Sequence, residues 1–174
     1  MNANIMDTLK SLEGPGQVWG ADGIAQDKGE ADFRRSDNFG LFSARLASSG
    51  VAETLKGAGP FTVFAMTDPA IEAHEQKVGP VNAEVLKYCI VAGKVSASGV
   101  SSADLTTLQG KKITYSRKFR KDFVDDAILG EKTFGPFADY PIDIACDNGV
   151  IHTIGIAMSP DYAAVGGGVG QTQL

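Results

Sequence analysis

The segment from Asn148 to Pro160 constrains the fold of this chain more than any other. It begins with Asn148-Gly149, a dipeptide that favours a type I′ hairpin turn because both residues tolerate positive φ angles. An apolar run follows and ends at Pro160, which cannot donate a backbone hydrogen bond to a neighbouring strand. Side chains alternate between the two faces of a strand, and both faces of this run are poor in charge. The segment therefore predicts a strand that is buried on both sides, with the earlier sequence folded around it.

Composition places the chain among ordinary globular proteins. With 174 residues, of which 43% are hydrophobic and 21% charged, it fits one domain and is neither disordered nor fibrous. The formal net charge of −5 argues against a globally basic nucleic-acid-binding protein. No apolar run approaches the ~20 residues that span a bilayer, and residues 1–7 lack the features of a secretion signal. Either the chain stays in the compartment where it is made, or a targeting segment has been removed.

Local patterns predict helices in the first half of the chain and strands in the second. The expected helices are 4–12 with Asn4 as its cap, one that starts after the capping residues 36–38, and shorter ones at 50–56, after Thr67 and at 81–88. Residues 101–105 are expected to form a short helical or turn segment. Asp68 is expected to cap the helix after Thr67. Strands are expected at 61–66, 89–92, 142–146 and from 149 onward, with a hairpin over 107–115 that turns at Gly110. This order predicts an α+β domain with helices against a mostly antiparallel sheet.

No residue constellation points to an enzyme. His152 lies mid-strand on an apolar face and His74 on a helix, so a structural role and a solvated role respectively are favoured over catalysis. Asp125 and Asp126 are adjacent, and surface charge is the default for such a pair. The glycine-rich run at 166–170 precedes no helix and does not form a phosphate-binding loop. We expect no metal and no cofactor.

The two cysteines, Cys89 and Cys146, lie in apolar runs. Buried free thiols are therefore expected, because cysteine behaves as a small hydrophobic residue in such places. A disulfide would need the two Cα atoms to lie within roughly 7 Å of each other, which spacing alone does not decide.

Basic residues concentrate between residues 111 and 121. The run contains Lys111, Lys112, Arg117, Lys118, Arg120 and Lys121, with Phe119 among them. In a chain of net charge −5 this predicts a local positive patch, either a solvated hairpin end or a docking surface for an acidic protein partner. Nucleic acid is the least favoured partner because the overall charge opposes it.

The segment 13–36 is long for a loop in a compact domain. It holds Trp19, Phe33, Arg34 and Arg35, and tryptophan and arginine are common interface anchors. The loop is expected either to contact a partner or to fold back on its own domain. Residues 117–141 are also expected to be irregular, and residues 161–174 form a glycine-rich tail that is flexible by composition.

Separated motifs resemble the fasciclin-like domain family. Residues 61–71, from Phe61 through Thr67-Asp68-Pro69, resemble the first motif of the family, and residues 86–94 resemble its central Tyr-His motif. Residues 148–154 are similar to the last motif, and residues 4–9 to the first helix. The resemblance implies one domain over residues 3–160, with insertions at 13–36 and 117–141. The implied fold is a wedge-shaped β-sandwich with several helices packed on it.

The chain departs from the family pattern at Met66 and Ile71, where proline and phenylalanine are usual, and at Cys89 and Gly155, where histidine and an acid are usual. Family adhesion has been tied to the regions of Cys89 and Gly155, so these departures argue against inherited adhesion chemistry there.

The resemblance implies a non-enzymatic interaction module, and three functions follow from it. The first is a structural linker in a large assembly, as in red-algal phycobilisomes, on the thylakoid surface in the plastid stroma. The second is an extracellular or periplasmic cell-adhesion domain whose signal has been removed. The third is a carotenoid- or lipid-binding protein, which would need an apolar pocket.

Overall fold

Two parallel strands form the centre of the fold. In the computed structural model, which describes residues 3–12, 39–130 and 141–160, these strands are β1 (Phe61–Met66) and β7 (Gly149–Ile154). They pair in register from Phe61 opposite Gly149 to Met66 opposite Ile154. β2 (Ile90–Ala92) and β6 (Ile144–Cys146) add antiparallel to the two edges, giving the order β2-β1-β7-β6. All six residues of β7 are buried, as its uncharged faces predict.

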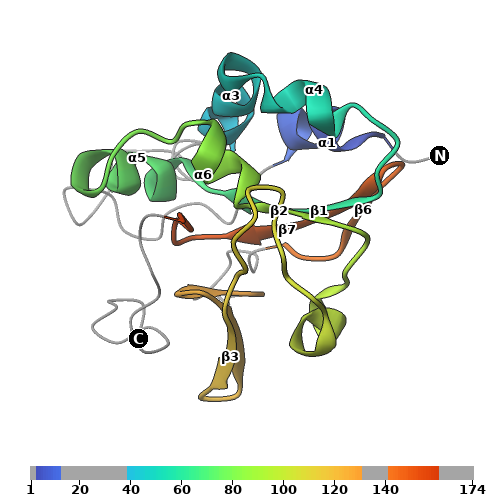
Figure 1. The fold of residues 1–174 in the computed structure, drawn as a ribbon, viewed down its shortest axis with the longest axis vertical. Helices are drawn as coiled ribbons and strands as arrows, with labels where there is room; N and C mark the ends of the chain where they lie inside the picture. Colours follow the sequence, from blue (N-terminus) through green and yellow to red (C-terminus); the bar gives the residue numbers. More distant parts are fainter. Residues whose placement is uncertain (1–2, 13–38, 131–140, 161–174) are drawn as a thin grey trace, which may run out of the picture.

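Helices cover one side of this sheet (Figure 1). They are α1 (Ile5–Ser11), α3 (Gly40–Ser49), α4 (Val51–Leu55), α5 (Asp68–Lys77) and α6 (Ala83–Lys87). Their apolar stripes supply the fully buried side chains of Ile5, Phe42 and Leu46. The short 3₁₀ helix η1 (Ala97–Ser102) lies on the other side of the sheet (Figure 1). The predicted helix over 4–12 is confirmed, including its cap, because the Asn4 side chain accepts a hydrogen bond from the Asp7 backbone N–H at 2.8 Å. The short helical or turn segment expected at 101–105 corresponds to η1, which begins four residues earlier, at Ala97.

A second, three-stranded antiparallel sheet lies on the other side of the first (Figure 1). It is built from β3 (Tyr115–Lys118), β4 (Lys121–Val124) and β5 (Ala127–Ile128). The expectation of an irregular segment from residue 117 is therefore wrong for this stretch, because short strands with polar outer faces lack the long apolar alternation that signals a strand. Two sheets with helices on one side form an α+β fold, as predicted.

Helix α5 begins differently from the prediction. Thr67, not Asp68, is its cap, and the Thr67 hydroxyl accepts from the Ala70 N–H at 3.3 Å. The Asp68 carboxylate instead accepts from the backbone N–H of Leu41 in the first turn of α3, at 2.8 Å. The cap residue of α3 is Phe39, which makes no side-chain cap bond, and the predicted capping residues 36–38 lie outside the described chain. Asp68 thus satisfies a helix terminus from a distant part of the sequence.

The Asn148-Gly149 dipeptide is not a type I′ turn. Cys146 pairs with Gly149, so the turn consists of Asp147 and Asn148, neither of which has a positive φ angle. Gly149 is needed because a Cβ atom there would collide with the carbonyl oxygen of Phe61 on the paired strand. The predicted hairpin between the last two strands is confirmed, but close strand contact rather than turn geometry requires its glycine.

The Asn148 side chain joins three parts of the domain. Its Oδ1 accepts from the Ile5 N–H at 3.0 Å, and its Nδ2 donates to the carbonyl oxygens of Leu55 at 2.7 Å and Gly57 at 2.9 Å. It therefore ties the start of α1 and the end of α4 to the turn before β7.

Candidate interaction site

The structure divides the predicted basic patch into two parts. Lys111 and Lys112 lie in the turn over residues 107–112, which packs against α6 and β2. There the ammonium of Lys111 donates to the Pro160 carbonyl at 3.3 Å, and that of Lys112 lies 3.8 Å from the Asp104 carboxylate. The predicted bend at Gly110 is present, because Thr106 bridges to Lys112 across it.

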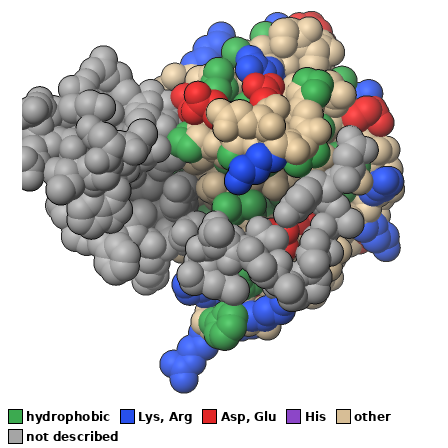
Figure 2. All heavy atoms as spheres, turned by 90° about the vertical axis from the view of Figure 1, so that its left-hand side faces the viewer, with side chains coloured by type: hydrophobic (Ala, Val, Ile, Leu, Met, Phe, Trp, Pro, Cys, Tyr) green, Lys and Arg blue, Asp and Glu red, His purple; other side chains and the backbone are tan. Residues whose placement is uncertain are grey.

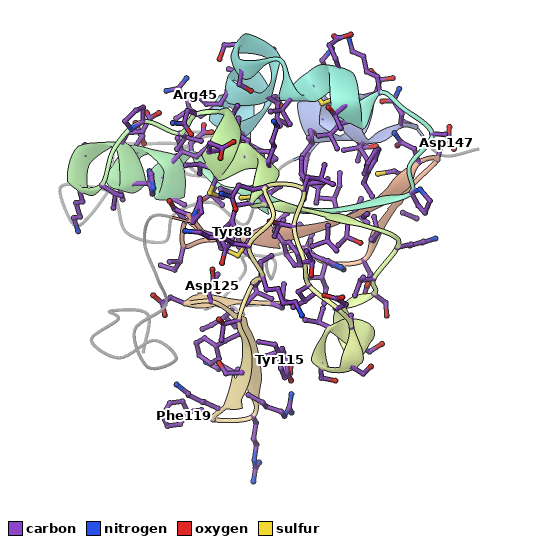
Figure 3. The ribbon with its side chains drawn as sticks, in the orientation of Figure 1. Arg45, Tyr88, Tyr115, Phe119, Asp125 and Asp147 are labelled. Carbon is purple, nitrogen blue, oxygen red and sulfur yellow. The ribbon has the colours of Figure 1, made fainter. Side chains whose placement is uncertain are left out.

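The other basic residues surround the end of the β3–β4 hairpin, which we call the hairpin tip (residues 117–121). Lys118 pairs with Lys121, so only Phe119 and Arg120 form the turn. Figure 3 shows Phe119 at the far end of this hairpin, away from the helices. The hairpin tip therefore keeps part of the predicted patch, Arg117, Lys118, Phe119, Arg120 and Lys121, while Lys111 and Lys112 lie elsewhere.

Both turn residues adopt left-handed backbone conformations. The φ angles of Phe119 and Arg120 are 52° and 64°. These values belong to a type I′ turn, whose two positions favour Asn-Gly because other residues are strained there. A left-handed conformation costs an ordinary residue roughly 1–2 kcal/mol. An aromatic and a cationic residue thus occupy two left-handed positions that Asn and Gly normally fill.

Ion pairing leaves two cations of the hairpin tip without an acidic partner. Arg117 donates to Asp122 at 2.8 Å, and the Tyr115 hydroxyl donates to the same carboxylate oxygen at 2.6 Å. The Tyr115 hydrogen bond, together with Arg117, holds the pKa of Asp122 below its usual range, and Asp122 in turn raises the pKa of Tyr115. Among the described residues, Arg120 and Lys121 have no acidic neighbour within ion-pair distance.

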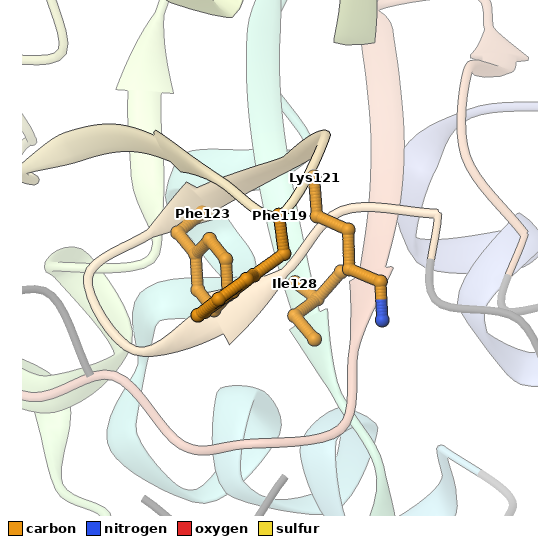
Figure 4. Close-up of a pocket in the computed structure, with 4 residues that line it drawn as sticks. All are labelled: Phe119, Lys121, Phe123 and Ile128. Atoms are coloured by element: carbon orange, nitrogen blue, oxygen red, sulfur yellow. The ribbon is translucent and has the colours of Figure 1, made fainter. Parts of the chain in front are cut away.

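A small apolar hollow opens beside Phe119. Its volume is about 190 Å³, and it is lined by Phe119, Lys121, Phe123 and Ile128 (Figure 4). Phe123 and Ile128 pair across β4 and β5 and are almost completely buried, so they form the floor. Phe119 is 73% exposed and forms the rim with Lys121. Figure 2 shows this end of the molecule as a hydrophobic group bordered by Lys and Arg side chains.

The sequence did not indicate Phe123 and Ile128 as site residues. The available signal was the alternation in β4, where Lys121 and Phe123 share one face of the strand while Val124 faces the core. Trp19, Phe33, Arg34 and Arg35, the other predicted contact residues, lie outside the described residues.

The buried His152 ring has structural hydrogen-bond partners rather than catalytic ones. His152 is fully buried; its Nδ1 accepts from the Asp143 N–H at 3.0 Å, so Nε2 carries the proton and donates to the Val95 carbonyl at 2.7 Å. Burial lowers the pKa of His152 and keeps the ring neutral. The prediction of a structural histidine at position 152 agrees with this arrangement. Among the described residues, the lining of the hollow contains no histidine, cysteine or acid.

Three polar residues are more buried than expected. His74 is 6% exposed, not solvated, and neither ring nitrogen has a hydrogen-bond partner. Asp125 and Asp126 are 5% and 2% exposed, so the expectation of surface charge is wrong. Asp125 is turned inward by its positive φ angle and accepts from the Tyr88 hydroxyl at 2.7 Å, and its burial raises the pKa of the carboxyl (Figure 3). Long-range packing, which a pair of adjacent acids does not reveal, decides these positions.

Both cysteines are free and buried, as predicted. Burial raises the pKa of the Cys89 thiol, which is unsuited to nucleophilic chemistry in that state. The described residues contain no group of His, Cys, Asp or Glu side chains placed to hold a metal ion. Within the same ranges, no helix has the length and apolar character needed to cross a membrane.

Comparison with known proteins settles the family. The model of the fasciclin domain matches residues 37–160, which include both sheets and the hairpin tip. The chain belongs to the fasciclin domain family. It is 30% identical over 134 residues to protein sll1483 of Synechocystis sp., a match that covers 72% of this chain and 69% of the relative.

A second relative is much longer than this chain. The chain is 30% identical over 138 residues to the pig transforming growth factor-beta-induced protein ig-h3, and the match covers 74% of this chain but only 19% of that protein. The fasciclin match begins at residue 37, and α1, which precedes it, packs in the same core. Fasciclin domains are typically adhesion or protein-interaction modules.

Proposed function

We propose that this fasciclin domain is a non-enzymatic protein-interaction module that docks on an acidic partner through its hairpin tip. The observation that carries the proposal is the exposure of Phe119 between cations on a strained two-residue turn. Exposed aromatic and arginine side chains are the commonest anchors of protein interfaces. A cationic tip on a chain of net charge −5 also favours one orientation of approach by an acidic surface.

Adhesion is the form of interaction that the comparisons favour. Fasciclin domains are typically adhesion or interaction modules, and neither relative carries a name that connects it with a light-harvesting antenna. The proposed role as a phycobilisome-type linker in a plastid therefore rests on the family resemblance alone. An extracellular or periplasmic adhesion domain is the better supported alternative, and the hairpin tip would serve either role.

The pigment or lipid alternative has little support from the hollow. Sites for small molecules usually enclose about 300–1,000 Å³. The hollow beside Phe119 encloses about 190 Å³, which is less than such a ligand needs.

Charge reversal at two separate places tests the proposal. The probe is immobilised poly-L-glutamate, and retention of the purified chain is measured at increasing salt. Arg120→Glu with Lys121→Glu should abolish retention, because these cations have no acidic partner among the described residues. Lys111→Glu with Lys112→Glu changes the total charge equally but lies in the other turn, and should weaken retention only slightly. Equal loss in both variants would mean that only net charge matters, and the proposal would be wrong.

A further inference from the structure

We infer that the hairpin tip recognises a short segment of a partner protein that carries one bulky apolar side chain between acidic residues. The apolar side chain enters the hollow beside Phe119, and the acidic residues pair with Arg120 and Lys121. This inference rests on the proposed function and adds to it the chemistry of the partner. It is carried by the shape of the hollow, the conformation of the turn and the positions of the unpaired cations.

The hollow has the size and lining of a socket for one side chain. Its floor consists of Phe123 and Ile128, which stand directly opposite each other on β4 and β5. Both lie on the sheet face that points away from the main core, because neither belongs to the core cluster that contains Val124 and Ala127. The volume of about 190 Å³ is too small for a drug-sized ligand, which needs about 300 Å³ or more. Because Phe123 and Ile128 expose only 1% and 2% of their surface, most of the apolar contact offered to a single inserted group comes from the Phe119 ring and the methylene groups of Lys121.

The turn holds the rim of the hollow in place. Only Phe119 and Arg120 lie between the paired residues Lys118 and Lys121, so the turn is a tight two-residue turn with few alternative conformations. Its left-handed φ angles of 52° and 64° set the directions in which the Cα–Cβ bonds of both residues leave the backbone. Figure 4 shows the Phe119 ring next to that of Phe123, with Lys121 beside Ile128. A contact surface that is already ordered loses less entropy on binding, so the strained turn favours affinity.

The charges select an acidic rather than a neutral segment. Arg117 is paired with Asp122, whereas Arg120 and Lys121 have no acidic partner among the described residues. Lys121 lines the hollow itself, so its side chain lies beside any segment whose apolar side chain enters. Carboxylates on either side of that side chain reach both cations.

An anionic membrane is a weaker match for the same residues. A bilayer takes up protruding apolar side chains, whereas this tip encloses a hollow with a buried floor. The net charge of −5 also opposes approach to an anionic surface once the tip has made contact. A protein segment uses both the hollow and the cations.

The experiment measures the binding of two fluorescent peptides by anisotropy. One peptide has a central phenylalanine flanked by glutamates, and the other has glycine in its place. The whole chain should bind the phenylalanine peptide about tenfold more tightly, because burial of one large apolar side chain is worth about that factor or more. Phe119→Ala should remove this preference. Val78→Ala, at the other large hydrophobic position that is exposed among the described residues, is the matched control and should keep the preference.

A second variant separates loss of binding from loss of folding. Phe119→Asn with Arg120→Gly gives the turn the residues that its geometry favours. It should raise the urea midpoint of unfolding and still lose the preference for the phenylalanine peptide. The weaker binding then cannot arise from unfolding.

The outcomes distinguish this inference from the proposed function. Equal affinity for both peptides, with Phe119→Ala unchanged, would overturn the apolar socket while leaving charge-dependent docking intact. Failure to bind either peptide at low salt would overturn both. Binding to phosphatidylserine vesicles that Phe119→Ala abolishes, without peptide binding, would assign the tip to a lipid surface instead and would also overturn the inference.

Discussion

Replacement of Asn148 by alanine should destabilise the domain more than its position in a surface turn implies. The side chain makes three hydrogen bonds to backbone groups that are about 90 to 140 residues away in the sequence. The bonds to the Ile5 N–H and the Leu55 carbonyl are buried, and the bond to the Gly57 carbonyl is partly exposed. Alanine removes the side-chain partner of all three groups at once.

The size of the effect follows from the burial of these groups. A buried donor or acceptor left without a partner costs about 1–3 kcal/mol, whereas the Gly57 carbonyl can bind water and costs less. The sum for Asn148→Ala is therefore about 3–5 kcal/mol, a large part of the roughly 5–15 kcal/mol that stabilises a typical domain. With a slope of about 2 kcal/mol per molar urea, the midpoint of unfolding should fall by about 2 M.

Urea unfolding followed by circular dichroism measures this change. Asn82→Ala is the control, because Asn82 caps α6 through one bond to the Val85 N–H and its loss should cost only about 1 kcal/mol. Asn148→Asp keeps the shape but turns an oxygen toward two carbonyl oxygens, and should be at least as destabilising as alanine at neutral pH. If Asn148→Ala costs no more than Asn82→Ala, the argument that Asn148 joins the three segments is refuted.

Three further changes test the interior. Burial lowers the pKa of His152, so its neutral ring stabilises the folded state fully above about pH 6.5, the usual pKa of a histidine in an unfolded chain. Below that pH the unfolded state binds a proton that the folded state excludes, and stability is lost. His152→Gln should therefore flatten the decline in the free energy of unfolding between about pH 6.5 and 5. His74→Leu should raise the free energy of unfolding by about 1 kcal/mol, because it removes a buried ring without hydrogen bonds; a loss of stability would show that the ring has a partner. Gly149→Ala should abolish soluble expression, since its Cβ collides with Phe61, and a soluble variant of unchanged stability would contradict the close strand contact.

Strand and helix positions were predictable because their signals are local. The apolar run after Gly149 and the segment 61–66 are strands in the structure, as their side-chain patterns indicate. Asn4 caps α1 because an asparagine side chain reaches the backbone N–H groups of the next turn without help from the rest of the chain. Motif order and spacing were enough for the family, and the fasciclin match over residues 37–160 confirms it.

The candidate site was only partly predictable. Sequence clustering indicated a basic patch, and Phe119, Arg120 and Lys121 indeed lie together at the hairpin tip. Clustering did not reveal that Lys111 and Lys112 belong to another turn, because the pairing of β3 with β4 carries the tip away from them. The floor of the hollow comes from the register of β4 with β5, which no local pattern specifies.

The sequence by itself determined the helices and the strands of the central sheet, since backbone preference and side-chain period depend on neighbouring residues, but it did not reveal the short strands β3, β4 and β5. Tertiary structure alone decided the roles of polar groups. The Asp68 carboxylate accepts a hydrogen bond from the N–H of Leu41 in α3, 27 residues earlier in the sequence. Asn148 accepts one from the N–H of Ile5, 143 residues away. Such partners meet only after the chain has folded, because a buried polar group must find whichever donor or acceptor the packing brings near it. The same holds for Gly149, whose absent side chain leaves room for the carbonyl of Phe61.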